Sequence, residues 1–190
     1  MNDLRIDYSS KEKYIESKKK IIEFIRNSIH LDEKREYLKG INCYSFALGF
    51  HFDIESFNKN WRFLTPGDIG NFISNNMSRI NDDNFEDKLR YDMDTLGIEL
   101  KRANESDESL CNLDSTNHLS WLIAAYLGKN ENGEIEDCHF LRKLPNGLWV
   151  HKFGFKTEDI LYSLQLNKYL MSPNELTYSQ KGIYQLRMKR

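Results

Sequence analysis

The chain has 190 residues, of which 39% are hydrophobic and 13% aromatic. That is enough apolar side chain for one well-packed domain and too much for a disordered chain. Its formal net charge is −2, which argues against a nucleic-acid-binding protein that relies on phosphate contacts. The most basic stretch, residues 18–20, has glutamates on both sides and is interpreted as a solvated helix face.

The sequence contains no pattern typical of an export signal or a membrane span. Residues 1–20 lack the apolar core of an export signal, and no run of about 18 apolar residues follows anywhere. We therefore expect no membrane span, and a cytoplasmic protein unless a phage or a dedicated secretion system delivers it. The three cysteines, Cys43, Cys111 and Cys138, have no CxxC spacing, which favours free thiols over a disulfide framework or a zinc site.

Helices are predicted mainly in the first half of the chain. Residues 10–30 contain isoleucines at helical spacing behind Ser9 or Ser10 as the N-cap, which predicts an amphipathic helix. Residues 43–48, CYSFAL, predict a short buried helix that ends near Gly49. The Pro66-Gly67-Asp68 stretch is typical of a turn. A polar helix is predicted over 83–96, and a loop over 101–118.

Strands are predicted in the second half. The apolar run at 119–128 predicts a central strand, and the alternating segments 136–144 and 147–155 predict a hairpin around residues 145–147. Residues 182–190 predict a last strand. Helices first and antiparallel strands afterwards indicate an α+β fold with its N-terminal helices packed on the sheet, in a single domain over 1–190.

Two histidines of the hairpin are expected to lie on one face of the sheet. Counted from Asn146, His139 is seven residues before and His151 five residues after, so they are near-diagonal neighbours. One imidazole can then act as a base while the other orients it. Cys138 is expected to point to the opposite face.

Cys43 is the candidate nucleophile. A thiol nucleophile needs a base, a group that orients the base, and donors for the oxyanion. The N-terminus of a helix stabilises a thiolate, and Cys43 stands where the predicted helix begins. A buried structural cysteine is the alternative interpretation, because free cysteine is among the most buried residue types.

Three stretches together resemble the papain-like cysteine peptidase and amidase superfamily, closest to its NlpC-type and CHAP-type branches. They are NCYSFAL (42–48), LTPGDIG (64–70) and DCHFLRKLPNGLWVHKFG (137–154). The last also resembles a group of bacterial proteins with a DYHFYR…DGxWSHKxG pattern. The resemblance covers about residues 40–155 and implies a papain-like fold.

The resemblance also implies roles for single residues. Cys43 is the nucleophile, His139 the general base and His151 the orienting residue, with Asn146 and Asp159 as rivals for that third position. The glutamine that serves the oxyanion hole in papain has no counterpart, which leaves Asn42 and the backbone N–H of Cys43. The distance from the PGD stretch to His139 implies an insertion around residues 75–115.

The function implied is hydrolysis of amide or peptide bonds through an acyl-enzyme, without a cofactor, on a peptide or protein substrate such as a peptidoglycan peptide. A deamidase or an acyltransferase would use the same groups. The alternative is a non-enzymatic protein-binding module on a papain-like or other α+β scaffold. A metal site built from His51, His118 and His139 is disfavoured, because HxH and HExxH spacings are missing.

Overall fold

The computed structural model of the chain describes residues 7–31, 41–50, 65–70, 80–111, 113–152, 160–163 and 176–190. Helices precede strands, which confirms the α+β class. The helices are α1 (Lys11–Asn27), α2 (Cys43–Leu48) and α5 (Phe85–Leu96). The strands are β1 (Ile98–Ala103), β2 (His118–Lys129), β3 (Ile135–Lys143), β4 (Trp149–Lys152), β5 (Ile160–Ser163) and β6 (Thr177–Lys189).

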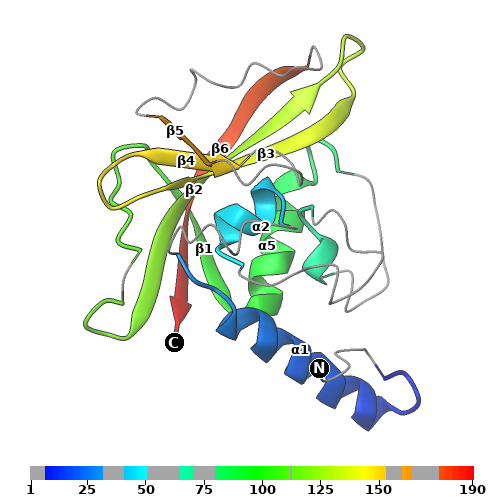
Figure 1. Cartoon of the computed structure of the whole chain (residues 1–190). Coiled ribbons are helices and arrows are strands. Elements are labelled where there is room, and N and C mark those ends of the chain that lie inside the picture. Colours follow the sequence, from blue (N-terminus) through cyan, green and yellow to red (C-terminus); the bar gives the residue numbers. More distant parts are fainter. Residues whose placement is uncertain are drawn as a thin grey trace.

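The strands form one six-stranded antiparallel sheet in the order β1-β6-β2-β3-β4-β5. Helices α2 and α5 lie on one side of this twisted sheet (Figure 1). Helix α2 packs on β3 and β4, and α5 packs beside β1. The predicted central strand is confirmed as β2, which pairs with β6 on one side and with β3 on the other.

The two faces of the sheet carry separate groups of buried apolar residues. The helix-side core joins residues of α1, α2 and α5 to Trp121, Ile123, Ala125, Phe140 and Val150 of the sheet. The opposite face carries a smaller group, here called the outer core: Leu122, Ala124, Tyr126, Leu141, Trp149 and Ile183. Because side chains alternate along a strand, the face of any residue of β3 or β4 follows from its position relative to these two groups.

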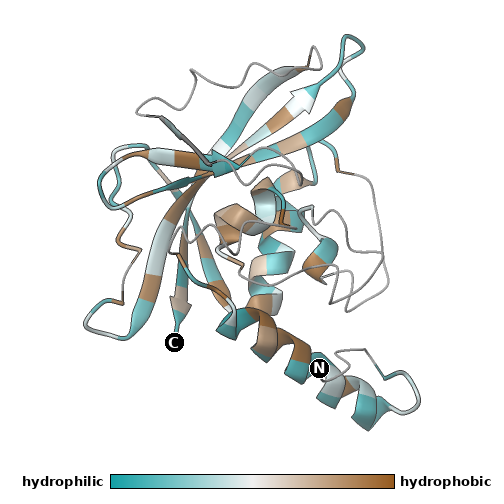
Figure 2. Cartoon of the chain, viewed as in Figure 1, coloured by the Kyte–Doolittle hydropathy of each residue, from teal (hydrophilic) through white to brown (hydrophobic). Residues whose placement is uncertain are grey.

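Helix α1 confirms the helix predicted at 10–30. Ser10 is its N-cap and accepts a hydrogen bond from the backbone N–H of Lys13 at 3.2 Å. Its second half meets the body of the protein through the buried side chains of Ile21 and Ile25. Figure 2 shows the same division, with the hydrophobic residues of α1 gathered in the half nearer to α5.

Helix α2 is short and wholly buried, as predicted. Its N-cap is Asn42, whose Oδ1 accepts from the backbone N–H of Ser45 at 2.9 Å. It ends at Gly49, which has φ 77° in the left-handed region. A Cβ atom there would lie 2.7 Å from the backbone oxygen of His30, so glycine is required on both grounds.

The predicted insertion around 75–115 contains α5 and β1. Phe85, Leu89, Met93 and Leu96 of α5 are all buried in the helix-side core. The loop predicted for 101–118 is wrong at its start, because β1 continues to Ala103. This segment therefore contributes to the core of the domain.

The predicted hairpin is confirmed as β3 and β4. The backbone N–H of Leu144 donates to the oxygen of Leu148 at 2.8 Å, and Gly147 takes φ 86° in the turn between them. The paired residues are Arg142 with Val150 and Lys143 with Trp149, so the β3–β4 ladder is short. Within the described part of the chain, no helix is long and apolar enough to cross a membrane.

Candidate active site

His139 and His151 form a hydrogen-bonded pair. Nε2 of His139 lies 2.8 Å from Nδ1 of His151, and the rings meet edge to face with centroids 5.0 Å apart. His139 is 3% exposed and His151 is 1% exposed. The prediction that the hairpin brings these two histidines together on one face is therefore confirmed.

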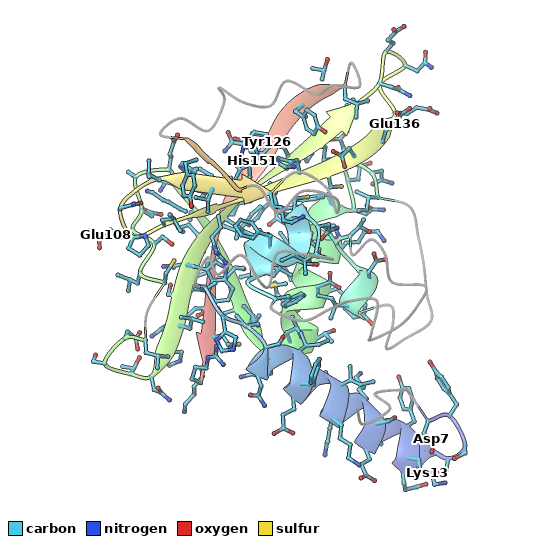
Figure 3. All side chains as sticks on the ribbon, in the orientation of Figure 1. Asp7, Lys13, Glu108, Tyr126, Glu136 and His151 are labelled. Carbon is cyan, nitrogen blue, oxygen red and sulfur yellow. The ribbon has the colours of Figure 1, made fainter. Side chains whose placement is uncertain are left out.

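The pair belongs to the outer face of the sheet. His139 is the direct cross-strand partner of Tyr126, a member of the outer core. The ring of Tyr178, which packs against the outer core, lies edge-on to His139 with centroids 6.2 Å apart. Figure 3 shows Tyr126 and His151 on the side of the sheet away from α2.

Burial sets the protonation of the pair. It lowers the pKa of His139 to about 3, helped by the neighbouring His151, and it lowers the pKa of His151 to about 4. Both imidazoles are therefore neutral at pH 7, and one N–H is shared between Nε2 of His139 and Nδ1 of His151.

Cys43 is held against the edge of β3. It is 8% exposed, and its Sγ donates to the backbone oxygen of Cys138 at 3.3 Å. The backbone N–H of Phe140 also lies against this sulfur. Cys138 and Phe140, which precede and follow His139 in the chain, therefore both contact Sγ of Cys43.

These contacts place Cys43 where the β3–β4 ladder stops. Leu144 bonds to Leu148 across the hairpin, so every second residue back along β3 presents its backbone groups towards β4. By this alternation the backbone groups of Cys138 and Phe140 also point towards β4, although the last β3–β4 pair on this side is Arg142 with Val150. The sulfur of Cys43 takes the place that a ladder partner would fill.

Cys43 and the histidine pair therefore reach the same part of the sheet from opposite sides. Cys43 packs in the helix-side core with Phe140, whereas His139 starts from the outer face. Neither imidazole is a hydrogen-bond partner of Cys43 among the described residues. The catalytic pairing of Cys43 with His139 stays a prediction, because α2 covers the face of β3 that carries Cys138 and His139 lies on the other face. Cys138 itself lies opposite His139, as expected.

The N-terminus of α2 was expected to lower the pKa of Cys43, but burial has the larger effect. Burial, together with the charge of Asp137, raises the pKa of Cys43 to about 12. The N–H groups of Phe140, Tyr44 and Cys43 itself act in the opposite direction, but they are the smaller influence. The thiol is protonated at neutral pH in this arrangement.

The secondary candidates have structural roles where they are described. Asn42 caps α2 with its Oδ1. Asn146 lies in the hairpin turn and accepts from the backbone N–H of Leu148 at 3.1 Å, at the end of the hairpin remote from His139, and its orienting role stays a prediction. Asp159 and His51 lie outside the described residues. His118 begins β2 and its Nδ1 lies 2.8 Å from Oγ1 of Thr116.

Within the described ranges, no group of three or more histidine, cysteine, aspartate and glutamate side chains gathers as a metal site would require.

Three buried ionisable residues near α2 were not predicted: Asp92, Arg142 and Lys152. Arg142 donates from Nη1 to the backbone oxygen of Phe46 at 3.2 Å, and its guanidinium stacks over the Phe46 ring. In the sequence, the alternation of β3 and β4 is the available signal, since it places Arg142 and Lys152 two residues from apolar positions.

Comparison of the chain with protein-family models, with curated proteins and with solved structures finds no match.

Proposed function

We propose that the chain is a papain-like cysteine hydrolase of amide or peptide bonds, with Cys43 as the nucleophile. His139 is the general base in this proposal and His151 orients it. The observation that carries the proposal is the meeting of these residues at the end of the β3–β4 ladder. Sγ of Cys43 contacts residues 138 and 140, while the residue between them bonds to His151 at 2.8 Å.

The histidine pair supplies the arrangement that a base needs. When Nε2–H of His139 donates to Nδ1 of His151, Nδ1 of His139 is the nitrogen that accepts a proton. Transfer from the thiol requires Sγ to leave the oxygen of Cys138 and turn into the gap between β3 and β4. The thiolate then attacks the carbonyl carbon, His139 returns the proton to the leaving amine, and water releases the acyl group.

The substrate class in this proposal is a peptide or protein, with peptidoglycan peptides as one example. The groups named need no cofactor. Deamidation or acyl transfer would use the same acyl-enzyme: deamidation differs in its leaving group, which is ammonia, and acyl transfer differs in the acceptor of the acyl group.

Alkylation of the folded protein tests the proposal. The protein is treated with iodoacetamide at pH 6 to 7 and each labelled cysteine is located by mass spectrometry. A catalytic Cys43 reacts faster than Cys111 and Cys138, and His139→Ala slows it, whereas His118→Ala at the start of β2 does not. If Cys43 is labelled only after denaturation, the hydrolase is excluded.

A non-enzymatic binding module is the second candidate, and the surroundings of Cys43 favour it. The thiol is buried, bonded to the backbone oxygen of Cys138, and has its pKa raised by burial to about 12. Such a cysteine is a packing residue. The alkylation experiment separates the two candidates, because the packing role predicts that Cys43 is the slowest of the three cysteines to react.

A further inference from the structure

Strand β1 stands at one end of the sheet, and one of its two edges faces away from β6. Of the strands that the structure describes, β6 alone pairs with it. The backbone oxygen of Leu100 points away from β6, because it accepts a long hydrogen bond, 3.4 Å, from Nη1 of Arg90 on α5. Residues 98, 100 and 102 therefore present their backbone groups at this outer edge of β1.

The pairing on the other side of β6 gives the same alternation. The backbone N–H of Arg190 donates to the oxygen of Asn117, so the even-numbered residues at this end of β6 bond towards β2 and the odd-numbered ones towards β1. The register sets Glu99 opposite Arg187 and Lys101 opposite Gln185. The odd-numbered residues of β1 thus bond to β6, which leaves the even-numbered ones for the outer edge.

Two opposite charges stand beside this edge. Ile98 and Leu100 belong to the helix-side core, so alternation turns Glu99 and Lys101 to the outer face. Their side chains are 48% and 62% exposed, and Nζ of Lys101 lies 2.8 Å from Oε1 of Glu99. Charged residues on an edge strand discourage pairing with most other strands. A strand that pairs here must therefore carry the complementary charges.

A second copy of β1 is such a strand. In an antiparallel pair, outward-facing residues lie opposite outward-facing residues, which limits the possible registers. When Leu100 lies opposite Leu100 of the second copy, each Glu99 lies opposite a Lys101, at positions where side chains approach closely. The next register on either side sets Glu99 against Glu99 or Lys101 against Lys101, which is repulsive. The charges of β1 thus select a single twofold register.

We infer that the outer edge of β1 pairs with the same edge of a second copy of this chain, antiparallel and centred on Leu100. The two six-stranded sheets then join into one. The two Leu100 residues exchange backbone hydrogen bonds, and a carbonyl oxygen has two lone pairs, so the contact from Arg90 is no obstacle. The inference is independent of the proposed function, whose residues lie towards the opposite end of the sheet.

Charge reversal tests this interface. The association of the wild type and of Lys101→Glu is measured by sedimentation equilibrium at low salt, with folding checked by circular dichroism. Lys101 is the better site for reversal, because its neighbour on β6, Gln185, is neutral. We expect a dimeric wild type and a dissociation constant at least about tenfold higher in the variant, since two attractive pairs become repulsive. Lys20→Glu, in the exposed ion pair with Glu16, is the matched control and should associate as the wild type does.

A mixture of two variants tests the register. Glu99→Lys and Lys101→Glu should each associate weakly alone, whereas an equimolar mixture should form a heterodimer. In the mixture, two basic side chains of one chain face two acidic side chains of the other. The double variant Glu99→Lys/Lys101→Glu should form a homodimer again. A wild type that is monomeric up to about 1 mM overturns the inference, and so does a folded mixture that stays monomeric or a Lys101→Glu dimer as tight as the wild type.

Hydrogen exchange followed by NMR reads the backbone of the same edge. The N–H of Leu100 should exchange more slowly as the protein concentration rises, because pairing removes it from water. The N–H of Lys101 already bonds to β6 and should exchange at the same rate at every concentration. A dimer in which the exchange of Leu100 is independent of concentration overturns the pairing of the two β1 edges.

Discussion

The phenol of Tyr44 donates a 2.8 Å hydrogen bond to the carboxylate of Asp92, which joins α2 to α5 at the residue next to Cys43. The same carboxylate accepts from the backbone N–H of Gly67 at 2.8 Å and of Gly70 at 2.7 Å. The completely buried side chain of Asp92 on α5 therefore binds both the Pro66-Gly67-Asp68 turn and α2.

The stability of the protein should fall with rising pH through Asp92. Burial raises the pKa of Asp92 to about 7, while in the unfolded chain this carboxyl ionises near 3.8. Between these values the folded state holds one more proton, so the free energy of unfolding decreases by at most about 1.4 kcal/mol per pH unit. Urea titrations from pH 4 to 7 should show a flatter loss in Asp92→Asn than in the wild type. The exposed Asp94→Asn on the same helix should keep the wild-type slope.

The histidine pair should make the stability of the protein fall as the pH decreases, opposite to the effect of Asp92. The lowered pKa values of His139 and His151 mean that the unfolded chain binds protons first as the pH falls below about 6.5. Their contribution to stability is complete above that pH and is lost towards pH 4. A variant with His139→Gln and His151→Gln should lose less stability between pH 6.5 and 4 than the wild type does. An equal acid loss in both proteins would contradict the lowered pKa values, and His118→Gln serves as the control.

Gly128 should not tolerate a side chain. A Cβ atom there would lie 2.9 Å from Cε1 of Tyr178, whose ring is also the edge-on neighbour of His139. We expect Gly128→Ala to lower the free energy of unfolding by about 1–3 kcal/mol, as overpacking does. In a Tyr178→Ser background the same change should cost much less, and equal costs in the two backgrounds would show that the ring is not the obstacle.

Arg26 should hold α1 on the body of the protein. Its Nη1 donates to the backbone oxygen of Leu96 at 2.5 Å, and its Nη2 donates to that of Lys189 at 2.8 Å. Arg26→Met should cost about 1–3 kcal/mol, because charged donors make the stronger hydrogen bonds. Hydrogen exchange should increase along α1. Lys20→Met, which removes an exposed ion pair with Glu16, should change little, and similar effects of the two variants would argue against this role of Arg26.

Local patterns were sufficient to predict most elements. The isoleucine spacing of α1, the Gly49 end of α2 and the turn of the β3–β4 hairpin all act over a few residues, and all are confirmed. Strand β1 was missed because its sequence, IELKRA, is half charged and lies at the edge of the sheet, where only its residues Ile98 and Leu100 are buried.

The candidate site was predictable only in part, for a related reason. Alternation along the hairpin decides that His139 and His151 share a face, and this is confirmed. Which face α2 covers depends on packing between distant segments, and no local pattern records it. For the same reason, Arg142 and Lys152 are buried although their residue types suggest exposure.

The position of β6 has a consequence for synthesis on the ribosome. It is the last strand in chain order, yet it lies between β1 and β2 and pairs with both. Among the described strands, β1 has no other neighbour. A nascent chain that has emerged only as far as β5 would therefore present one whole side of β2 and all of β1 as open strand edges, which invite pairing with other chains. These edges close when β6 is made and pairs with both β1 and β2.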